Sequence, residues 1–213
     1  MFFKGLELTT PINSAVLMLF TPVFVFVISI LAGREKVSFW RMSGIIIAAA
    51  GAFFLVFNNK FSIGSETLWG DLLTIFNAIS YAVYLVYVKG LLKKYHPFTV
   101  SRYTFMYGLI FVSFFGFNQV IDADYLSFPP KIIAIIFFVL IATTFLTYLL
   151  NAWALQHASS SLVGAYIYLQ PVLASIIAEI SGTDKLNLQR IIYILIIFTG
   201  VYLVSKKYKS NED

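Results

Sequence analysis

The stretch TPINSAVLMLFTPVFVFVISILAGREKVSFWRMSGIIIAAAGAFFLV, residues Thr10–Val56, decides the fold because it recurs 149 residues later in the same chain. Its counterpart is SSSLVGAYIYLQPVLASIIAEISGTDKLNLQRIIYILIIFTGVYLVS, residues Ser159–Ser205, and the two align without a gap. The aligned pairs include Pro22 with Pro171, Gly33 with Gly182, Glu35 with Asp184, and Arg41 with Arg190. Each copy contains an apolar helix with a proline, a short charged turn and a second apolar helix, which indicates an internal structural repeat.

The composition is that of a membrane protein. Of the 213 residues, 60% are hydrophobic and 12% are charged, and the mean hydropathy is +0.86. Soluble domains carry about 25% charged residues. The lack of cysteine excludes disulfides, thiol catalysis and cysteine-bound metal. The net charge of +5 comes from basic residues in short loops between apolar segments, so it predicts orientation in a bilayer and argues against nucleic-acid binding.

Seven apolar segments predict membrane-spanning helices, each of which needs about 20 mainly apolar residues. Turn-forming residues such as Gly33–Lys36 and Gly182–Lys185 separate these segments, and the shortest segments are marginal in length. The predicted spans are Ile12–Leu31, Met42–Phe57, Leu68–Val88, Tyr103–Ile121, Ile132–Leu155, Ser160–Ile180 and Ile191–Val204.

Lysine and arginine residues are unequally distributed between the two ends of these spans. Ten lie on the side of the C-terminal tail and five on the other side, so the positive-inside rule predicts a cytoplasmic C-terminus. The turn around Glu35 then faces the cytoplasm and the turn around Asp184 faces outward, which predicts that the two copies are inverted. Inverted copies each need an odd number of spans, but the first copy has two and the second has five. We therefore expect a shortened chain in which part of the first copy is missing.

These segments resemble the EamA-like members of the drug/metabolite transporter superfamily. Residues Glu7–Ser38 and Gly44–Val56 resemble the fourth and fifth helices of that family. The segment WGDLLTIFNAISYAVYLVYVK, Trp69–Lys89, resembles the sixth, with its Gly-Asp pair at the helix start. Residues Gln156–Leu186 and Gly200–Val204 resemble the ninth and tenth helices.

The resemblance implies an all-α, polytopic membrane bundle of two inverted five-helix repeats, with ten spans in the family and about seven here. Residues 1–57 would be the remainder of the first repeat, residues 66–205 a complete second repeat, and residues 206–213 a cytoplasmic tail. It also implies secondary transport by alternating access, which we expect to export a small metabolite such as an amino acid. The expected location is the cell membrane, in a prokaryote the inner membrane.

Two prolines lie in the middle of predicted spans, Pro22 and Pro171. A proline removes one backbone hydrogen bond and kinks a helix, and broken helices often line transport pathways. Because the proline recurs in both copies, we predict a hinge or pathway role, with a simple packing kink as the alternative. A row of small residues in the next span, Gly44, Ala48 and Ala52, predicts close packing against another helix.

Polar side chains within the spans share helix faces, because residues spaced by three, four or seven lie on one side of a helix. We predict that these faces line a mildly polar, aromatic cavity for an uncharged or zwitterionic solute. The alternative is ordinary interhelical hydrogen bonding, worth about 0.6 kcal/mol each. The predicted pathway residues are Asn13, Thr21, Asn77, Tyr81, Tyr84, Tyr148, Asn151, Tyr166 and Gln170.

Two acids near the ends of spans are candidates for proton coupling, Asp71 and Glu179. Asp71 lies in the first turn of its helix, where the helix dipole stabilises an anion, so an anion at a helix start is the simpler interpretation. Glu179 occupies a position that is usually apolar in the family.

The expected partners are a small-molecule substrate and the lipid bilayer, together with a second copy of the chain or a missing N-terminal half. No cofactor or metal, no enzymatic activity and no nucleic acid are expected, since no catalytic or metal-ligand pattern occurs. The alternative function is a non-transporting remnant or a membrane scaffold protein.

Overall fold

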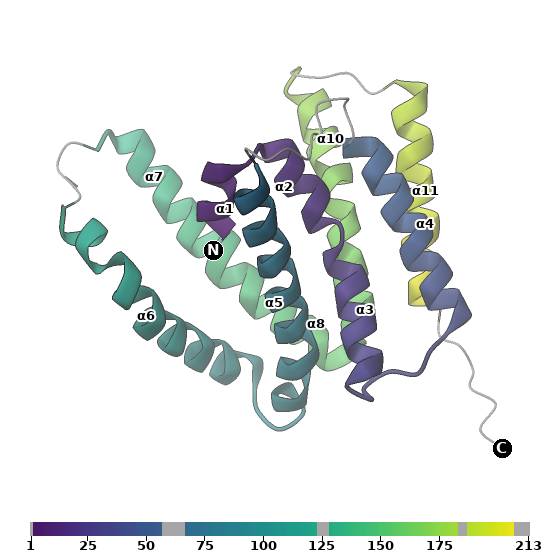
Figure 1. Ribbon diagram of the computed structural model, residues 1–213, viewed down its shortest axis with the longest axis horizontal. Coiled ribbons are helices and arrows are strands. Elements are labelled where there is room, and N and C mark those ends of the chain that lie inside the picture. Colours follow the sequence, from purple (N-terminus) through teal and green to yellow (C-terminus); the bar gives the residue numbers. More distant parts are fainter. Residues whose placement is uncertain (1, 57–66, 123–127, 183–186, 207–213) are drawn as a thin grey trace. The chain divides into compact units, whose positions relative to one another are not determined.

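The computed structural model describes residues 2–56, 67–122, 128–182 and 187–206, and every element in these ranges is helical (Figure 1). Most elements are α-helices, whereas η2 is a π-helical stretch and η3 is a 3₁₀ turn. In chain order they are α1 (Phe2–Leu8), α2 (Pro11–Met18), α3 (Thr21–Leu31), α4 (Phe39–Val56), α5 (Leu68–Leu92), α6 (Pro97–Asp122), α7 (Pro130–Phe138), η2 (Val139–Leu146), α8 (Thr147–His157), α9 (Ser160–Ala165), η3 (Tyr166–Leu169), α10 (Gln170–Ile180) and α11 (Leu188–Ser205).

Seven helical spans within the described residues are long and apolar enough to cross a membrane, which confirms the predicted all-α polytopic bundle. Their boundaries differ from the predicted ones by several residues at some ends. Most of the predicted tail (residues 207–213) and the charged turn at residues 183–186 lie outside the described residues. The observed spans are Pro11–Leu31, Phe39–Val56, Leu68–Leu92, Pro97–Phe117, Pro130–His157, Ser160–Ile180 and Leu188–Ser205.

The chain divides into two compact units, which we describe separately. The first consists of Met1–Val86 with Ser159–Asp213, and the second of Tyr87–Ala158. In the second unit α6 packs against α8, where the rings of Phe105 and Tyr148 lie 5.3 Å apart between centroids.

The fifth span was predicted as one uniform helix, but the structure places the π-helical stretch η2 in its middle. There the Thr147 hydroxyl donates to the Ala142 carbonyl five residues back, at 3.1 Å. A widened stretch of this kind leaves no clear sequence signal, since its residues are as apolar as those around it.

The first unit preserves the repeat at the level of helix boundaries. Helices α3 and α10 are 149 residues apart at both ends, and so are α4 and α11. The helix caps repeat as well, because the side chain of Thr10 accepts from the Asn13 N–H and that of Ser159 accepts from the Leu162 N–H. Hydroxyl side chains at this position satisfy a backbone donor that the helix itself leaves unpaired.

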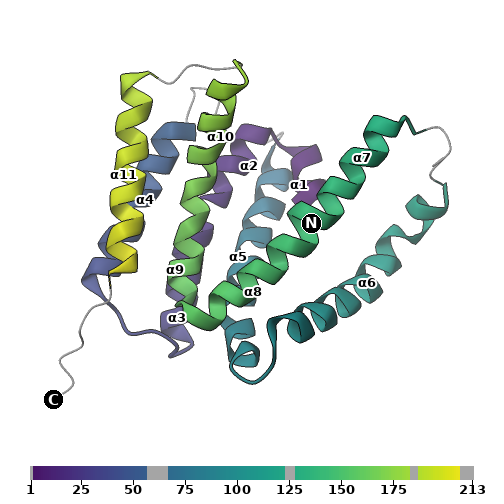
Figure 2. The same ribbon diagram turned by 180° about the vertical axis from the view of Figure 1, so that it is seen from behind.

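The turns after α3 and α10 also match. Gly33 and Gly182 both have a left-handed backbone, with φ of 63° and 66°, which side chains with a Cβ rarely adopt. The two helix pairs nevertheless run in opposite directions: α3 ends and α4 begins at one end of the unit, whereas α10 ends and α11 begins at the other (Figures 1 and 2). This arrangement agrees with the inversion that the charge distribution predicts.

Helices α4 and α11 form the closest packing of the unit. A Cβ added at Gly51 would lie 2.9 Å from the Ile197 side chain, and one added at Gly200 would lie 2.7 Å from the Ala48 Cβ. These two contacts are related by the repeat, because residues 51 and 200, like residues 48 and 197, are 149 apart. The close packing predicted from the small residues of α4 is therefore confirmed.

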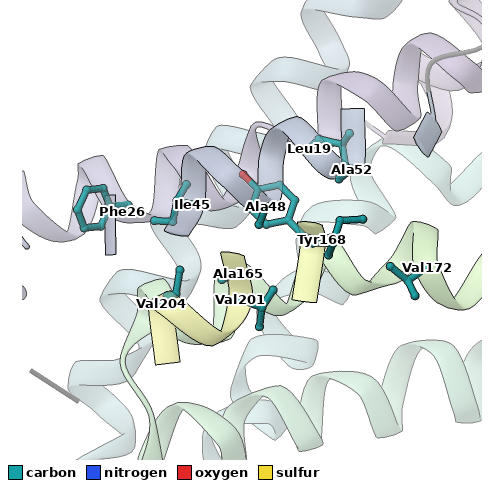
Figure 3. Close-up of a cluster of buried hydrophobic side chains, with 11 residues drawn as sticks. Leu19, Phe26, Ile45, Ala48, Ala52, Ala165, Tyr168, Val172, Val201 and Val204 are labelled. Atoms are coloured by element: carbon teal, nitrogen blue, oxygen red, sulfur yellow. The ribbon is translucent and has the colours of Figure 1, made fainter. Parts of the chain in front are cut away.

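A hydrophobic cluster continues from this contact towards the broken helices (Figure 3). It includes side chains from α3, α4, α9, η3, α10 and α11, so it joins the two copies of the repeat. The buried members are Leu19, Phe26, Ile45, Ala48, Ala52, Ala165, Tyr168, Val172, Ile197, Val201 and Val204.

Candidate functional site

The first span is broken between α2 and α3, just before Pro22. The Phe20 N–H donates to the Leu17 carbonyl at 3.1 Å, three residues back instead of the four of an α-helix. A proline cannot donate to the carbonyl of the preceding turn, so the helix tightens upstream of it.

The sixth span is broken at the corresponding place, where η3 precedes Pro171. The Gln170 N–H donates to the Ile167 carbonyl, which is the acceptor that Pro171 would have served in a regular helix. The interruptions expected at both prolines are thus confirmed, while the proposed hinge role stays a prediction.

A pocket of about 610 Å³ lies between the two broken helices, on the side of the breaks formed by α2 and α10. Its remaining walls come from α1, the end of α4 and the start of α11. Most of the lining side chains are apolar, and the volume is within the range of small-molecule sites. The polar lining residues are Ser14, Gln170, Ser175 and Arg190.

The predicted pathway residues of the broken helices have different positions. Gln170 lines the pocket, and so does Pro171, the residue predicted as a hinge or kink. Asn13 and Thr21 are fully buried and are not among the lining residues. Tyr166, 53% exposed, lies at the break but also outside the lining.

The pathway residues predicted on α5 are half-buried in the first unit. The Asn77 amide nitrogen lies 3.8 Å from the sulfur of Met18, which lines the pocket. Tyr81 and Tyr84 stack on each other, with centroids 6.1 Å apart.

Tyr148 and Asn151 are half-buried on α8, in the second unit. The predicted set is therefore brought together only in part, and its role in a pathway stays a prediction.

A cluster of polar side chains surrounds Asp71, which is 6% exposed. Thr9 Oγ1 donates to Asp71 Oδ1 at 2.5 Å, and Thr67 Oγ1 donates to Oδ2 at 3.0 Å. Asn13 Nδ2 is a longer donor to Oδ1, at 3.4 Å. These donors stabilise the carboxylate away from bulk water, so Asp71 joins the start of α2 to the start of α5.

The Asp71 cluster lies directly behind the pocket wall. Ser14, which lines the pocket, lies 3.2 Å from Thr74 Oγ1 through its own hydroxyl. Glu179, by contrast, is exposed near the end of α10 and does not line the pocket.

The other halves of the broken helices are tightly packed. Helix α9 packs against α3, and a Cβ added at Gly164 would lie 3.3 Å from the Val25 Cβ. At this end Glu35 Oε1 accepts from the Ser161 N–H at 3.1 Å, and Arg41 Nη1 donates to Glu35 Oε2 at 2.9 Å. The Glu35 side chain is only 8% exposed, so the first copy contacts the second through a shielded charge.

The family model for the EamA-like transporter family matches residues 1–57 and 68–206. The chain belongs to the EamA-like transporter family. It is therefore a multi-pass membrane transporter, and a role in transport rather than in catalysis is indicated.

Relatives of this EamA-like chain include proteins that are named as transporters. It is 29% identical over 206 residues to an uncharacterized transporter of Archaeoglobus fulgidus, covering 96% of this chain and 70% of that protein. It is 22% identical to the uncharacterized transporter YoaV of Bacillus subtilis, covering 93% and 68%. A WAT1-related protein of Arabidopsis thaliana matches at 22% identity, over 95% and 63% of the two chains.

The fold of this EamA-like transporter is similar to that of a protein of known crystal structure, with a TM-score of 0.78 at 16% sequence identity. The similarity covers 96% of this chain and 70% of the other. It supports the helical bundle alone.

Several side chains at the site of this transporter were not predicted from the sequence. Ser14, Ser175 and Arg190 line the pocket, and Glu35 joins the two copies at the opposite end. The available signal was the repeat itself, since it aligns Glu35 with a second acid and Arg190 with Arg41. Tyr168 was not predicted either. Its hydroxyl is buried, and no hydrogen-bond partner for it is found among the described residues.

Proposed function

We propose that this chain acts as a secondary transporter that exports a small uncharged or zwitterionic metabolite, such as an amino acid. The pocket between the two broken helices is the observation that carries this proposal. It combines an apolar lining with a few polar groups, which suits a solute with a small polar head and an apolar body.

Alternating access around this pocket is the proposed mechanism. The two copies of the repeat run in opposite directions, so α2 of the first copy lies with α10 of the second copy at one end of the first unit, and α3 lies with α9 at the other. The pocket is at one end and the tight packing of α3 with α9 is at the other. A transporter needs such a difference between its ends, because both must not be open at once.

The proposed location is the cell membrane, and the proposed orientation places the C-terminus in the cytoplasm. Helix α11 ends at the same end of the first unit as α3 (Figure 2), whereas its residue that lines the pocket, Arg190, lies near its start. In this orientation the pocket faces the outside. The Lys and Arg excess on the C-terminal side supports it.

Asp71 and Glu179 are the proposed candidates for proton coupling, and Asp71 is better placed. It is buried and lies behind the pocket wall, whereas Glu179 is exposed. Coupling through Asp71 is supported if Asp71→Asn abolishes substrate transport driven by a proton gradient but retains counterflow of the substrate. Full retention of the gradient response would contradict it.

The function is tested with proteoliposomes and a panel of radiolabelled neutral amino acids. Gln170→Leu removes a polar group of the pocket, and leaving a solute group unpaired costs about 1–3 kcal/mol, so we expect transport to fall by at least about fivefold. Gln189→Leu is the matched control, because Gln189 is exposed on α11 outside the pocket. Equal transport rates in the two variants would contradict the pocket assignment, and no flux of any panel member would contradict the substrate class.

A further inference from the structure

The packing at the two ends of the first unit can be compared residue by residue, because the repeat relates positions at one end to positions at the other. Residues at the packed end have repeat-related positions that line the pocket. Gly164 and Val25, which are buried against each other, correspond to Ala15 and Ala174. Ala15 and Ala174 are exposed and line the pocket.

The same correspondence holds nearer the end of the unit. Ser161, whose N–H donates to Glu35, is fully buried, whereas its counterpart Ile12 lines the pocket. Two equivalent helix contacts are therefore in different states, one closed and one open, although the repeat provides similar surfaces for both. Ala15 and Ala174 carry small side chains, which permit helix backbones to approach closely.

We infer that the contact of Glu35 with Ser161 and Arg41 is the latch that holds α9 against α3, and that in the second state of the transporter Ala15 packs against Ala174 instead. This inference rests on the alternating access proposed above and assigns the residues that set the balance between its states. Glu35 is a positioning residue, since it lies at the end opposite the pocket.

The chemistry of the latch favours such a role. Glu35 accepts a hydrogen bond from a backbone N–H of the second copy and is held by Arg41 of the first copy, so the charge pair keeps the carboxylate aimed at α9. Charge-assisted hydrogen bonds are stronger than neutral ones, and this one is shielded from solvent. Breaking the hydrogen bond between Glu35 and Ser161 exposes the Glu35 carboxylate and the start of α9 to water, which solvates both.

Cysteine cross-linking tests the inference directly, because the chain has no cysteine of its own. The Cβ separation of 3.3 Å built at Gly164 and Val25 is close to the 3.5–4.5 Å of disulfides. We expect Val25→Cys/Gly164→Cys to cross-link in the pocket-open state and Ala15→Cys/Ala174→Cys to cross-link in the other. Both pairs are oxidised in proteoliposomes holding the full chain.

Adding Glu35→Ala should lower the yield of the first pair and raise that of the second. We expect the ratio of the yields to change about tenfold, which corresponds to 1.4 kcal/mol. Glu35→Gln should give a smaller change, because its amide oxygen still accepts from the Ser161 N–H. Glu7→Ala is the control, since Glu7 is an exposed acid whose salt bridge with Lys4 lies on the surface.

A single-cysteine measurement covers the case in which a double variant fails to fold. Ala174→Cys should react with a soluble maleimide in the otherwise unchanged chain, and Glu35→Ala should slow that reaction. Unchanged labelling and unchanged cross-linking in Glu35→Ala would overturn the latch, as would a second pair that never cross-links. A shift in these readouts without amino-acid flux would support the latch and contradict only the proposed substrate.

Discussion

Replacing Gly200 with alanine should destabilise the protein through the contact between α4 and α11. The added Cβ would lie 2.6 Å from the Gly44 carbonyl oxygen and 2.7 Å from the Ala48 Cβ. Neither neighbour can rotate away, because one is a backbone atom and the other is fixed to the backbone. The two helices must therefore separate.

The cost follows from two opposing terms. Overpacking of a core costs roughly 1–3 kcal/mol, and the backbone partners place this case at the upper end. Alanine regains about 1 kcal/mol over glycine in a helix. We expect a net loss of about 2 kcal/mol in the free energy of unfolding, or a fall of about 4–8 °C in Tm for a chain of this size.

Gly108→Ala is the matched control, because Gly108 also lies in a helix but has nothing within 4 Å of an added Cβ. It should be neutral or slightly stabilising. The two variants are compared by thermal unfolding in one detergent, followed by intrinsic fluorescence. Equal Tm values for Gly200→Ala and Gly108→Ala would refute the close packing and the argument from it.

Two further changes probe the polar cluster and the break. Asp71→Asn should lower the free energy of unfolding by about 1.5–3 kcal/mol, since the charge that accepts from Thr9 and Thr67 is lost. Denaturation in mixed micelles measures this loss. The control is Glu7→Gln, which replaces an exposed acid and should leave the free energy of unfolding unchanged. Equal stability of the two variants would show that the cluster around Asp71 contributes nothing. Pro171→Ala restores a backbone donor and should straighten the sixth span. Maleimide labelling of Ser175→Cys in the pocket should then become slower, and an unchanged rate would remove Pro171 from the control of pocket shape.

The sequence alone predicted the features that depend on local chemistry. The apolar lengths predicted the spans, Pro22 and Pro171 predicted the breaks, and Gly33 and Gly182 predicted the turns. These features follow from backbone geometry and from the bilayer, which act on a few neighbouring residues at a time.

The composition of the pocket could not be predicted in the same way. Helical spacing indicates which residues share a face, but not which other helix that face meets. Asn13 shares the predicted helix face, but it is buried beside Asp71 and is not among the residues that line the pocket. Glu35 and Ser161 are 126 residues apart in the chain, and only the packing of α3 with α9 brings them together.

The break itself altered the predicted face of the sixth span. The sequence pattern placed Tyr166 and Gln170 on one side on the assumption of 3.6 residues per turn. The intervening residues form a 3₁₀ turn with about three residues per turn. Residues four apart do not share one face of such a turn, and of these two side chains Gln170 lines the pocket.

The contact between α4 and α11 is self-complementary, as in a two-fold homodimer. Position 51 meets position 197 as position 200 meets position 48, so each half of the interface is the image of the other. The size of a side chain at one of these positions is consequently limited by the residue that it meets on the other helix. The same geometry would let two separate, oppositely inserted copies of a single repeat associate without any linking segment.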